Sequence, residues 1–187
     1  SSYGISIVKE YAGIKNAIKH TGSYGREILI EEWIEGRELT VSVLNEKALP
    51  VIEIKTATGI YDYEAKYKSD KTRYNVLTPG DDSSETTLSH DVYERAQELA
   101  VRAHNSLGCR TFSRVDMILN KDDKIYVLEV NTIPGFTERS LLPKAAAAAN
   151  ISFPELCNVI VNAACKCTLM PEQATRAGIN NKNIANI

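Results

Sequence analysis

Two short apolar runs separated by a polar turn constrain this chain more than any other feature. Residues 114–119 and 125–130 are rich in Val, Ile and Leu, and the segment between them is Asn-Lys-Asp-Asp-Lys. This pattern is typical of two antiparallel strands joined by a turn. A turn centred between the two aspartates pairs Asp116 with Glu129, with Cβ atoms about 5 Å apart. The sequence therefore predicts a hairpin that brings two acidic side chains together among apolar neighbours.

One face of that hairpin is a candidate cation site. Asn131 lies two residues beyond Glu129, and Arg114 lies two residues before Asp116, so strand alternation places all four on one face. Two close carboxylates repel unless a cation lies between them, and oxygen ligands with few carboxylates suit Mg²⁺. The alternative is an exposed strand face with an incidental ion pair. The Pro-Gly turn that ends at Gly135 favours the site, because glycine lets backbone N–H groups approach a substrate.

Length and composition narrow the class of protein. The 187 residues suffice for one ordinary domain, or one domain plus a fragment, and 43% of them are hydrophobic. The net charge is −2 without a basic stripe, so we expect no nucleic-acid partner. No apolar run approaches the roughly 20 residues of a membrane span. The four sparse cysteines indicate reduced thiols in a cytoplasmic protein, and the first residue, Ser1, suggests a fragment.

Periodicity predicts the remaining elements and an α+β class. Strands are expected at 4–9, 27–33, 38–44 and 49–54, and helices at 11–20, 88–107, 141–149 and 152–167. Residues 55–80 lack periodicity, and the stretch from 60 to 75 holds four tyrosines and four basic residues. A loop of this length is often a lid over a site. A solvated connection is the alternative that the pattern leaves open.

Five segments resemble the D-alanine–D-alanine ligases of the ATP-grasp superfamily. In family order across residues 1–156 they are SSYGISIV, EILIEEWIEGRELTVSVL, YDYEAKY, RVDMIL and LEVNTIPGFTERSLLPKAAAAANISFPEL. The resemblance implies the ATP-grasp fold, a mainly antiparallel sheet flanked by helices. It also implies three parts: a partial lid subdomain over 1–36, the C-terminal catalytic domain over 37–170 and a polar tail over 171–187.

The resemblance implies a reaction as well as a fold. Such ligases join two D-alanines through an acyl phosphate at the expense of ATP, in the cytoplasm, for peptidoglycan synthesis, cell-wall biogenesis and cell shape. Residues matching Asp116, Glu129 and Asn131 hold two Mg²⁺ ions, or Mn²⁺ in their place, against the ATP phosphates. Arg114 and the backbone N–H of Gly135 resemble the family's oxyanion donors.

Further residues match the nucleotide and substrate sites of the family. Six match ATP contacts: Glu31, Glu32, Trp33 and Ile34 at the adenine, Glu38 at the ribose and Lys66 at the γ-phosphate. Ser2 and Tyr67 match the serine and tyrosine-rich loops that close over the site. Ser140 and Leu141, at a predicted helix N-terminus, match the receiver of the second substrate's carboxylate. A tyrosine at position 67 implies D-alanine rather than D-lactate as that substrate.

The departures from the family pattern bear on what this chain does alone. Family members carry an N-terminal domain for the first D-alanine and two upstream ATP-binding lysines, which nothing here matches. The expected partners are therefore ATP, D-alanine and the missing N-terminal part, with a homodimer when complete. The chain alone is expected to be inactive. Two alternatives remain: another ATP-grasp carboxylate–amine ligase, against which YDYEAKY and NTIPGFTERS argue, or a non-catalytic nucleotide-binding fragment.

Overall fold

The computed structural model describes residues 4–55, 72–81 and 84–168 of the chain. Ser2, Lys66 and Tyr67, three of the predicted site residues, lie outside these ranges, as do the centre of the predicted lid and the predicted tail. The centre of the fold is a six-stranded antiparallel sheet in the order β4-β3-β1-β7-β8, with β2 added beside β1. Its strands are β1 (Gly36–Leu44), β2 (Lys47–Ala48), β3 (Ile52–Lys55), β4 (Arg73–Val76), β7 (Phe112–Asn120) and β8 (Ile125–Asn131).

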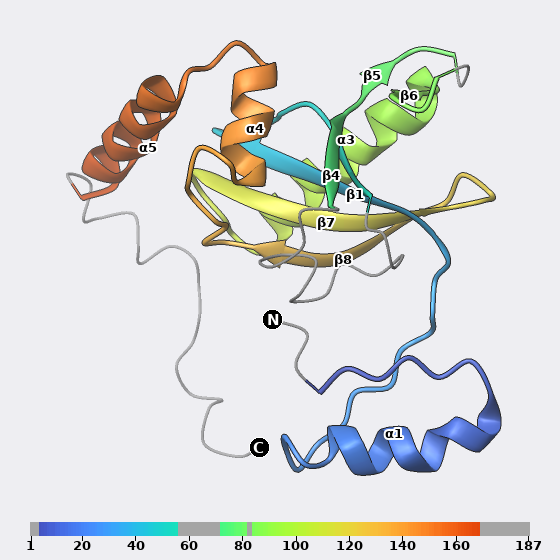
Figure 1. Cartoon of the computed structure of the whole chain (residues 1–187). Helices are drawn as coiled ribbons and strands as arrows, with labels where there is room; N and C mark the ends of the chain where they lie inside the picture. The colour runs from blue at the N-terminus through green and yellow to red at the C-terminus, as the bar shows by residue number, and fades with distance from the viewer. Residues whose placement is uncertain (1–3, 56–71, 82–83, 169–187) are drawn as a thin grey trace.

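Helices cover the two faces of this sheet (Figure 1). Helix α3 (His90–Ser106) packs on one face and α4 (Leu141–Ala148) on the other, and α5 (Phe153–Thr168) packs against α4 beside the sheet. A short parallel pair, β5 (Thr78–Pro79) and β6 (Thr87–Leu88), leads into α3. The mainly antiparallel sheet flanked by helices confirms the predicted fold class.

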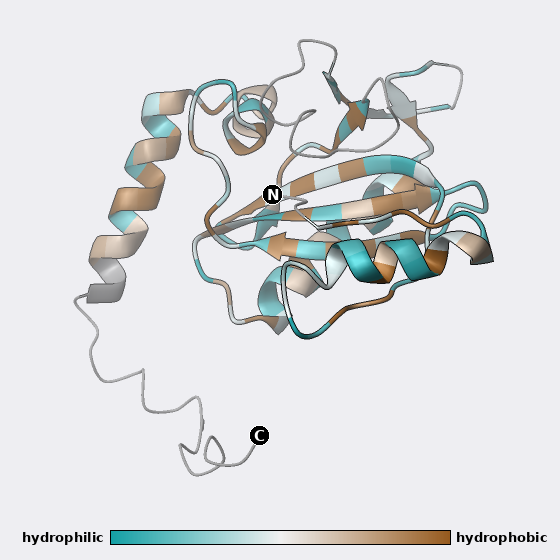
Figure 2. Cartoon of the chain, turned by 60° about the horizontal axis from the view of Figure 1, so that its bottom comes forward, coloured by the Kyte–Doolittle hydropathy of each residue, from teal (hydrophilic) through white to brown (hydrophobic). Residues whose placement is uncertain are grey.

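Strand β1 shows how the sequence positions the sheet between these layers. Leu39, Val41 and Val43 point toward α3 and are fully buried. The residues that alternate with them, Thr40 and Ser42, face the opposite side and are also buried, at 1% and 2% exposure. Figure 2 shows this alternation of apolar and polar residues along the strands. Buried hydroxyl groups need hydrogen-bond partners, and the partner of Thr40 belongs to the site described below.

The segment before β1 departs from the predicted secondary structure. Strands were expected over 4–9 and 27–33, but within the described part of the chain neither range pairs with another strand. Leu29 and Ile30 are 78% and 77% exposed. A strand needs a neighbour for its backbone hydrogen bonds, and apolar alternation alone does not supply one. Those two predictions were wrong.

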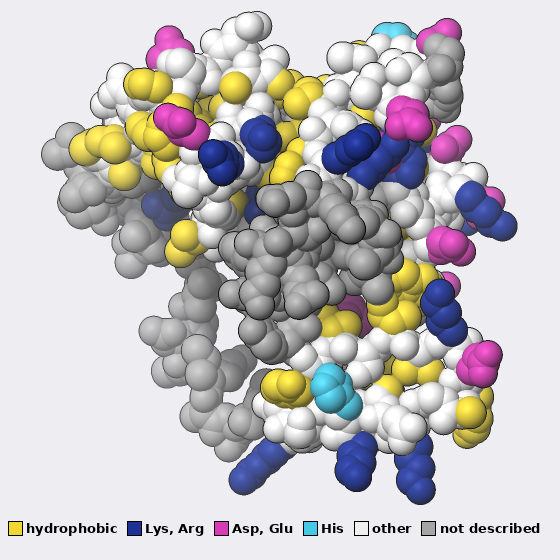
Figure 3. All heavy atoms as spheres, in the orientation of Figure 1, with side chains coloured by type: hydrophobic (Ala, Val, Ile, Leu, Met, Phe, Trp, Pro, Cys, Tyr) yellow, Lys and Arg dark blue, Asp and Glu magenta, His cyan; other side chains and the backbone are white. Residues whose placement is uncertain are grey.

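The helical part of that segment follows the prediction more closely. A 3₁₀ turn, η1 (Tyr11–Gly13), leads into α1 (Ile14–Thr21), close to the helix expected over 11–20. Neither element contains a buried residue in the described structure. Figure 1 shows the segment set apart from the sheet, and Figure 3 shows apolar side chains at its surface and basic side chains along its lower edge, away from the sheet.

The region between β1 and α3 is more regular than the sequence indicated. The turn after β1 has two residues with positive φ, Asn45 and Glu46, which favours a two-residue hairpin. The strand expected over 49–54 begins only at Ile52, and the short strand β2 (47–48) ends before it. β4 and β5 lie in the stretch for which no periodicity was found, whereas residues 56–71 fall outside the description.

The other helices agree with their sequence signals. Ser89 caps α3 by accepting a hydrogen bond from the Val92 N–H, and Gly108 follows it with a φ of 65°. Ser152 and Glu155 form a reciprocal capping box at the start of α5. In the described part of the chain, no helix has the length and apolar character that a membrane span requires. Three of the four cysteines, Cys109, Cys157 and Cys165, are free thiols, in line with the prediction.

Candidate active site

The β7–β8 hairpin pairs the two predicted carboxylates, although its turn differs from the prediction. Asp116 lies opposite Glu129, as expected. Near the turn, however, Leu119 pairs with Ile125, which centres the turn half a residue earlier than predicted. A strand register displaced in this way carries alternate side chains to opposite faces. Asp116 can therefore lie opposite Glu129 only if the register of the two strands shifts by one residue between the turn and this pair.

A β-bulge at Leu128 supplies that correction. The register shifts between Asp116 and Met117, whose partners are Glu129 and Val127, so Leu128 is the extra residue. Without the bulge, Asp116 would pair with Leu128, and Glu129 would face α3. The bulge re-aims Glu129 onto the opposite face, which is a common role of bulges beside sites. Nothing in the sequence pattern identified it.

Asp116 is the centre of the resulting cluster. Its Oδ1 accepts hydrogen bonds from Thr40 Oγ1 at 2.7 Å and from Arg114 Nε at 2.8 Å. Its Oδ2 accepts from Arg114 Nη2 at 2.6 Å and from Asn131 Nδ2 at 3.0 Å. The side chain is buried, at 5% exposure, so these four donors satisfy a charge that burial would otherwise penalise.

Asn131 links Asp116 to the second carboxylate. Its Nδ2 also donates to Glu129 Oε1 at 3.1 Å, so the amide nitrogen lies between the two acids. Glu129 is exposed, whereas Asp116 is buried. The described residues hold no cluster of three or more His, Cys, Asp or Glu side chains that would bind a metal unaided. Two carboxylates and one amide suit a hard cation that keeps water or phosphate as further ligands.

The loop after β8 is fixed in place by an aromatic contact. Phe136 lies between Phe112 at the start of β7 and Phe153 at the start of α5, with ring centroids 6.4 and 5.4 Å apart. Gly135 precedes it, and a Cβ at that position would lie 3.0 Å from Ser140 Oγ. A Cβ at position 135 would require the Ser140 hydroxyl to shift, so the glycine allows this close approach. The aromatic anchor therefore positions both predicted substrate contacts, Gly135 and Ser140.

Helix α4 begins without the usual side-chain cap. Ser140 is the N-cap residue, but its hydroxyl accepts a hydrogen bond from the Thr137 N–H at 3.1 Å and makes no capping bond. Pro143 occupies the third helical position and has no N–H. The Ser140 hydroxyl therefore lacks one of the two backbone donors that an N-cap side chain normally accepts from. The N–H groups of Leu141 and Leu142 donate no hydrogen bond to that side chain, so they are available to a carboxylate at this helix end.

The predicted nucleotide residues divide between the two sides of the sheet. Glu38 lies on the Asp116 face of β1, two residues from Thr40. Glu32, Trp33 and Ile34 instead border a hollow of about 690 Å³ whose other walls come from the start of α3 and the β7–β8 turn. This hollow lies on the α3 side, so the structure does not join Glu38 and the predicted adenine residues in one cavity. Glu31 is exposed and is not among the residues of the hollow.

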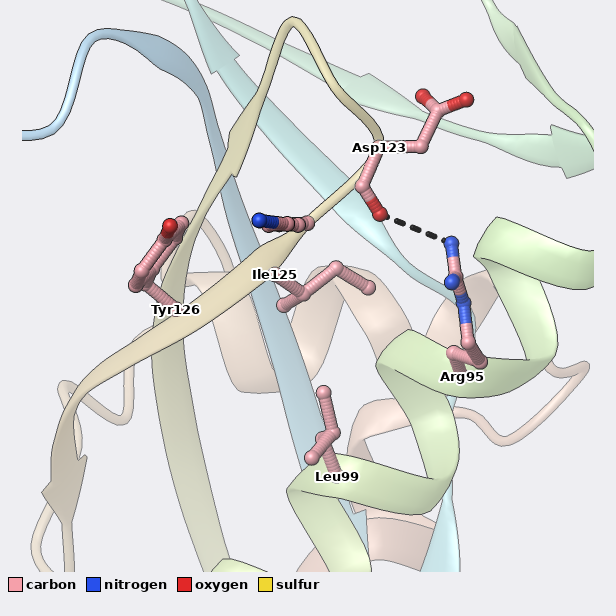
Figure 4. Close-up of a pocket in the computed structure, with 6 residues that line it drawn as sticks. Arg95, Leu99, Asp123, Ile125 and Tyr126 are labelled. Carbon is pink, nitrogen blue, oxygen red and sulfur yellow. Dashed lines mark hydrogen bonds between the residues drawn. The ribbon is translucent and has the colours of Figure 1, made fainter.

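A second, smaller hollow adjoins the first and was not predicted. It has a volume of about 330 Å³ and lies between α3 and the β7–β8 turn (Figure 4). Arg95 closes one end by donating from Nη2 to the Asp123 carbonyl at 2.9 Å, and Leu99, Ile125 and Tyr126 also line it. Its walls include no residue of the Asp116 cluster.

Comparison with known sequences identifies this arrangement. The sequence model of the protein family described as D-ala D-ala ligase C-terminus matches residues 1–162. A D-alanine–D-alanine ligase of Clostridium botulinum is 40% identical over 166 residues, which cover 89% of this chain and 52% of that protein. One from Marinobacter nauticus is 44% identical over 159 residues, covering 83% and 46%.

Solved structures give the same result for the fold. The Bacillus anthracis D-alanine–D-alanine ligase complexed with ATP superposes with a TM-score of 0.72 at 30% identity, covering 88% of this chain and 50% of that one. The VanG D-Ala:D-Ser ligase of Enterococcus faecalis gives 0.72 at 32% identity, covering 87% and 46%. The sheet and its flanking helices thus define an ATP-grasp protein. Within that class, the chain belongs to the D-alanine–D-alanine ligase family, and it spans about half the length of the relatives it matches.

Proposed function

We propose that this chain is the nucleotide- and cation-binding half of an ATP-dependent ligase that joins two D-alanines through an acyl phosphate. The observation that carries the proposal is the convergence of Asp116, Glu129, Asn131 and Arg114 at one strand end. The similarity to a ligase solved with ATP supports the nucleotide. The 40% identity to a D-alanine–D-alanine ligase supports the substrate.

The donor set fits Mg²⁺, with Mn²⁺ as a substitute, and Asp116, Glu129 and Asn131 would hold two such ions. Bound there, the ions would neutralise negative charge on the ATP phosphates during phosphoryl transfer. Asn131 directs its NH₂ group at both carboxylates in this structure. The amide must therefore turn over before its carbonyl oxygen can join the carboxylates as a ligand.

Arg114 and the loop after β8 supply the groups that would contact the reacting carboxyl. The guanidinium of Arg114 is held at the strand end by its two bonds to Asp116 and carries the charge that a phosphate or oxyanion needs nearby. The Gly135 N–H would be a second donor to the oxyanion. The start of α4 at Ser140 and Leu141 would receive the carboxylate of the second D-alanine.

Residues 1–36 would belong to the nucleotide lid, residues 37–170 to the catalytic domain and residues 171–187 to a tail. The half of the relatives that this chain does not match would supply the first D-alanine site, and the complete enzyme would be a homodimer. Glu31 to Ile34 and Glu38 would bind the nucleoside, with Lys66, Ser2 and Tyr67 closing over the phosphates. The product would enter peptidoglycan synthesis in the cytoplasm.

A chimaera tests this function directly. The unmatched N-terminal half of the Clostridium botulinum relative is placed before residue 1, and the fusion is incubated with ATP, Mg²⁺ and D-alanine. We expect D-alanyl-D-alanine by mass spectrometry with one phosphate released per dipeptide, and no product from the 187-residue chain alone. A fusion that folds and binds ATP but forms no dipeptide would overturn the proposal.

One structural neighbour motivates a second candidate for the nucleophile. VanG, a D-Ala:D-Ser ligase, matches the fold as well as the Bacillus anthracis enzyme does. We propose D-alanine as the second substrate of this protein, because Tyr67 matches the lid tyrosine of ligases that form the dipeptide. The chimaera is therefore given equal D-alanine, D-serine and D-lactate, and D-alanyl-D-alanine is expected to dominate. Predominant D-alanyl-D-serine would favour the second candidate, and predominant depsipeptide would remove the role assigned to Tyr67.

A further inference from the structure

Thr40 contacts the centre of the candidate site from a strand that the sequence analysis did not connect with it. Its Oγ1 lies 2.7 Å from Asp116 Oδ1 and 3.4 Å from the Val115 carbonyl. The hydroxyl has one proton, and the shorter contact to a charged acceptor is the stronger hydrogen bond. Thr40 therefore donates to Asp116, and it is paired directly opposite that residue across β1 and β7.

Thr40 differs in kind from the two other donors to Asp116. Thr40 is 1% exposed, and the branched side chain has few χ1 rotamers in a strand at the centre of the sheet. Arg114 and Asn131 are long or rotatable polar groups at the strand end, and both have proposed roles toward phosphate or cation. Thr40 has no such second role, so it can keep its bond to Oδ1 while those two side chains rearrange.

We propose that Thr40 is a positioning residue that holds Asp116 in the rotamer required for cation binding. The bond holds Oδ1 in place, so that Oδ2 can bind the cation once its amide and guanidinium donors have moved away. Partners that orient a metal ligand in this way commonly contribute 10- to 100-fold to metal affinity. The inference rests on the proposed cation site and names the residue of β1 on which its affinity depends.

The test compares cation binding in variants of the full 187-residue chain. Thr40→Val keeps the branched shape without the hydroxyl, Thr40→Ala also lacks it, and Thr40→Ser restores it. Ser42→Ala is the matched control, because it removes a buried hydroxyl two residues along the same face of β1. Mn²⁺ is titrated in the presence of a non-hydrolysable ATP analogue and followed by electron paramagnetic resonance, and the melting temperature of each variant is recorded.

We expect Thr40→Val and Thr40→Ala to weaken Mn²⁺ binding roughly tenfold. Thr40→Ser and Ser42→Ala should remain within about twofold of the wild type, since both keep a hydroxyl donor to Asp116. Either hydroxyl-free variant decides the comparison if the other does not fold. Equal affinity in wild type and Thr40→Val, or loss of affinity in Thr40→Ser equal to that in Thr40→Val, would overturn this inference alone. A wild-type chain that binds no Mn²⁺ would overturn the cation site itself and this inference with it.

Discussion

The central sheet and the segment before it respond differently to the same kind of sequence. Residues 27–33 and 38–44 both show strand-like apolar patterns, but only the second range forms a strand. β1 has hydrogen-bonded neighbours on both sides, β3 and β7, whereas residues 27–33 pair with no strand in the described part of the chain. Leu39 is fully buried and Leu29 is 78% exposed. An apolar, strand-like pattern therefore shows only that a segment could join a sheet. Whether it forms a strand depends on a neighbouring strand that can accept and donate its backbone hydrogen bonds.

The largest expected effect compares one leucine from each region. Leu39→Ala should lower the free energy of unfolding by about 3 kcal/mol, because it opens a cavity in the core under α3. Leu29→Ala should change it by no more than about 0.5 kcal/mol, since that side chain is exposed. Urea denaturation followed by circular dichroism measures both. Equal losses would mean that the N-terminal segment is packed against the domain in solution.

The second prediction separates function from stability within the sheet. In the chimaera, Glu129→Gln should lower kcat about 100-fold, which corresponds to about 2.7 kcal/mol of transition-state stabilisation. Because Glu129 is exposed, the melting temperature should hardly change. Glu98→Gln, the same change at an exposed position on α3, is the control and should leave both quantities unaltered. An unchanged kcat at saturating Mg²⁺ would exclude Glu129 as a ligand.

The junction between the two regions gives the third prediction. A Cβ built at Gly36, the first residue of β1, overlaps the carbonyl of Leu119 on β7. Gly36→Ala should therefore destabilise the sheet by about 2 kcal/mol through overpacking of rigid backbone. At Gly25 the nearest atom to a new Cβ is 3.8 Å away, so Gly25→Ala should be neutral or slightly stabilising. Differential scanning calorimetry on both variants checks the contrast, which would fail if Gly36→Ala melted like the wild type.

The smallest effect concerns the starts of two helices. At α5, hydrogen bonds from the Ser152 hydroxyl and N–H lower the pKa of Glu155 below its ordinary value of 4.5. A lowered folded-state pKa contributes stability above the ordinary value, and this contribution is lost as the pH falls through the folded-state pKa. The N-cap of α1, Gly13, makes no side-chain bond of this kind.

Glu155→Ala should therefore reduce the melting temperature slightly at pH 7, and the difference from wild type should shrink by pH 3. Melting followed at 222 nm across this range measures it, with Glu98→Ala as the control for removing a helix glutamate. A difference that is constant with pH would show that the capping carboxylate contributes nothing through its charge.

Much of the site could be predicted because its signals are local. Strand alternation places Arg114 and Asp116 on one face and Glu129 and Asn131 together, without knowledge of the rest of the fold. The pairing of Asp116 with Glu129 was also predicted correctly, but from a turn position that the structure corrects. The turn lies half a residue earlier than predicted, which alone would shift the strand pairing by one residue. The extra residue at the Leu128 bulge shifts the pairing back, so Asp116 still lies opposite Glu129. The predicted adenine residues remain a proposal, and the structure places three of them at a hollow on the other side of the sheet from Glu38.

The sequence by itself determined the elements whose signals lie within a few residues. These include the β7–β8 hairpin, the end of α3 at Gly108 and the Ser152 cap of α5, because turns, caps and alternation act between near neighbours. The tertiary structure alone decided the bulge, the missing pairing of residues 27–33 and the contact of Thr40 with Asp116. That contact joins residues 76 positions apart. Which strand lies beside which depends on packing across the whole sheet, and no short stretch of sequence contains that information.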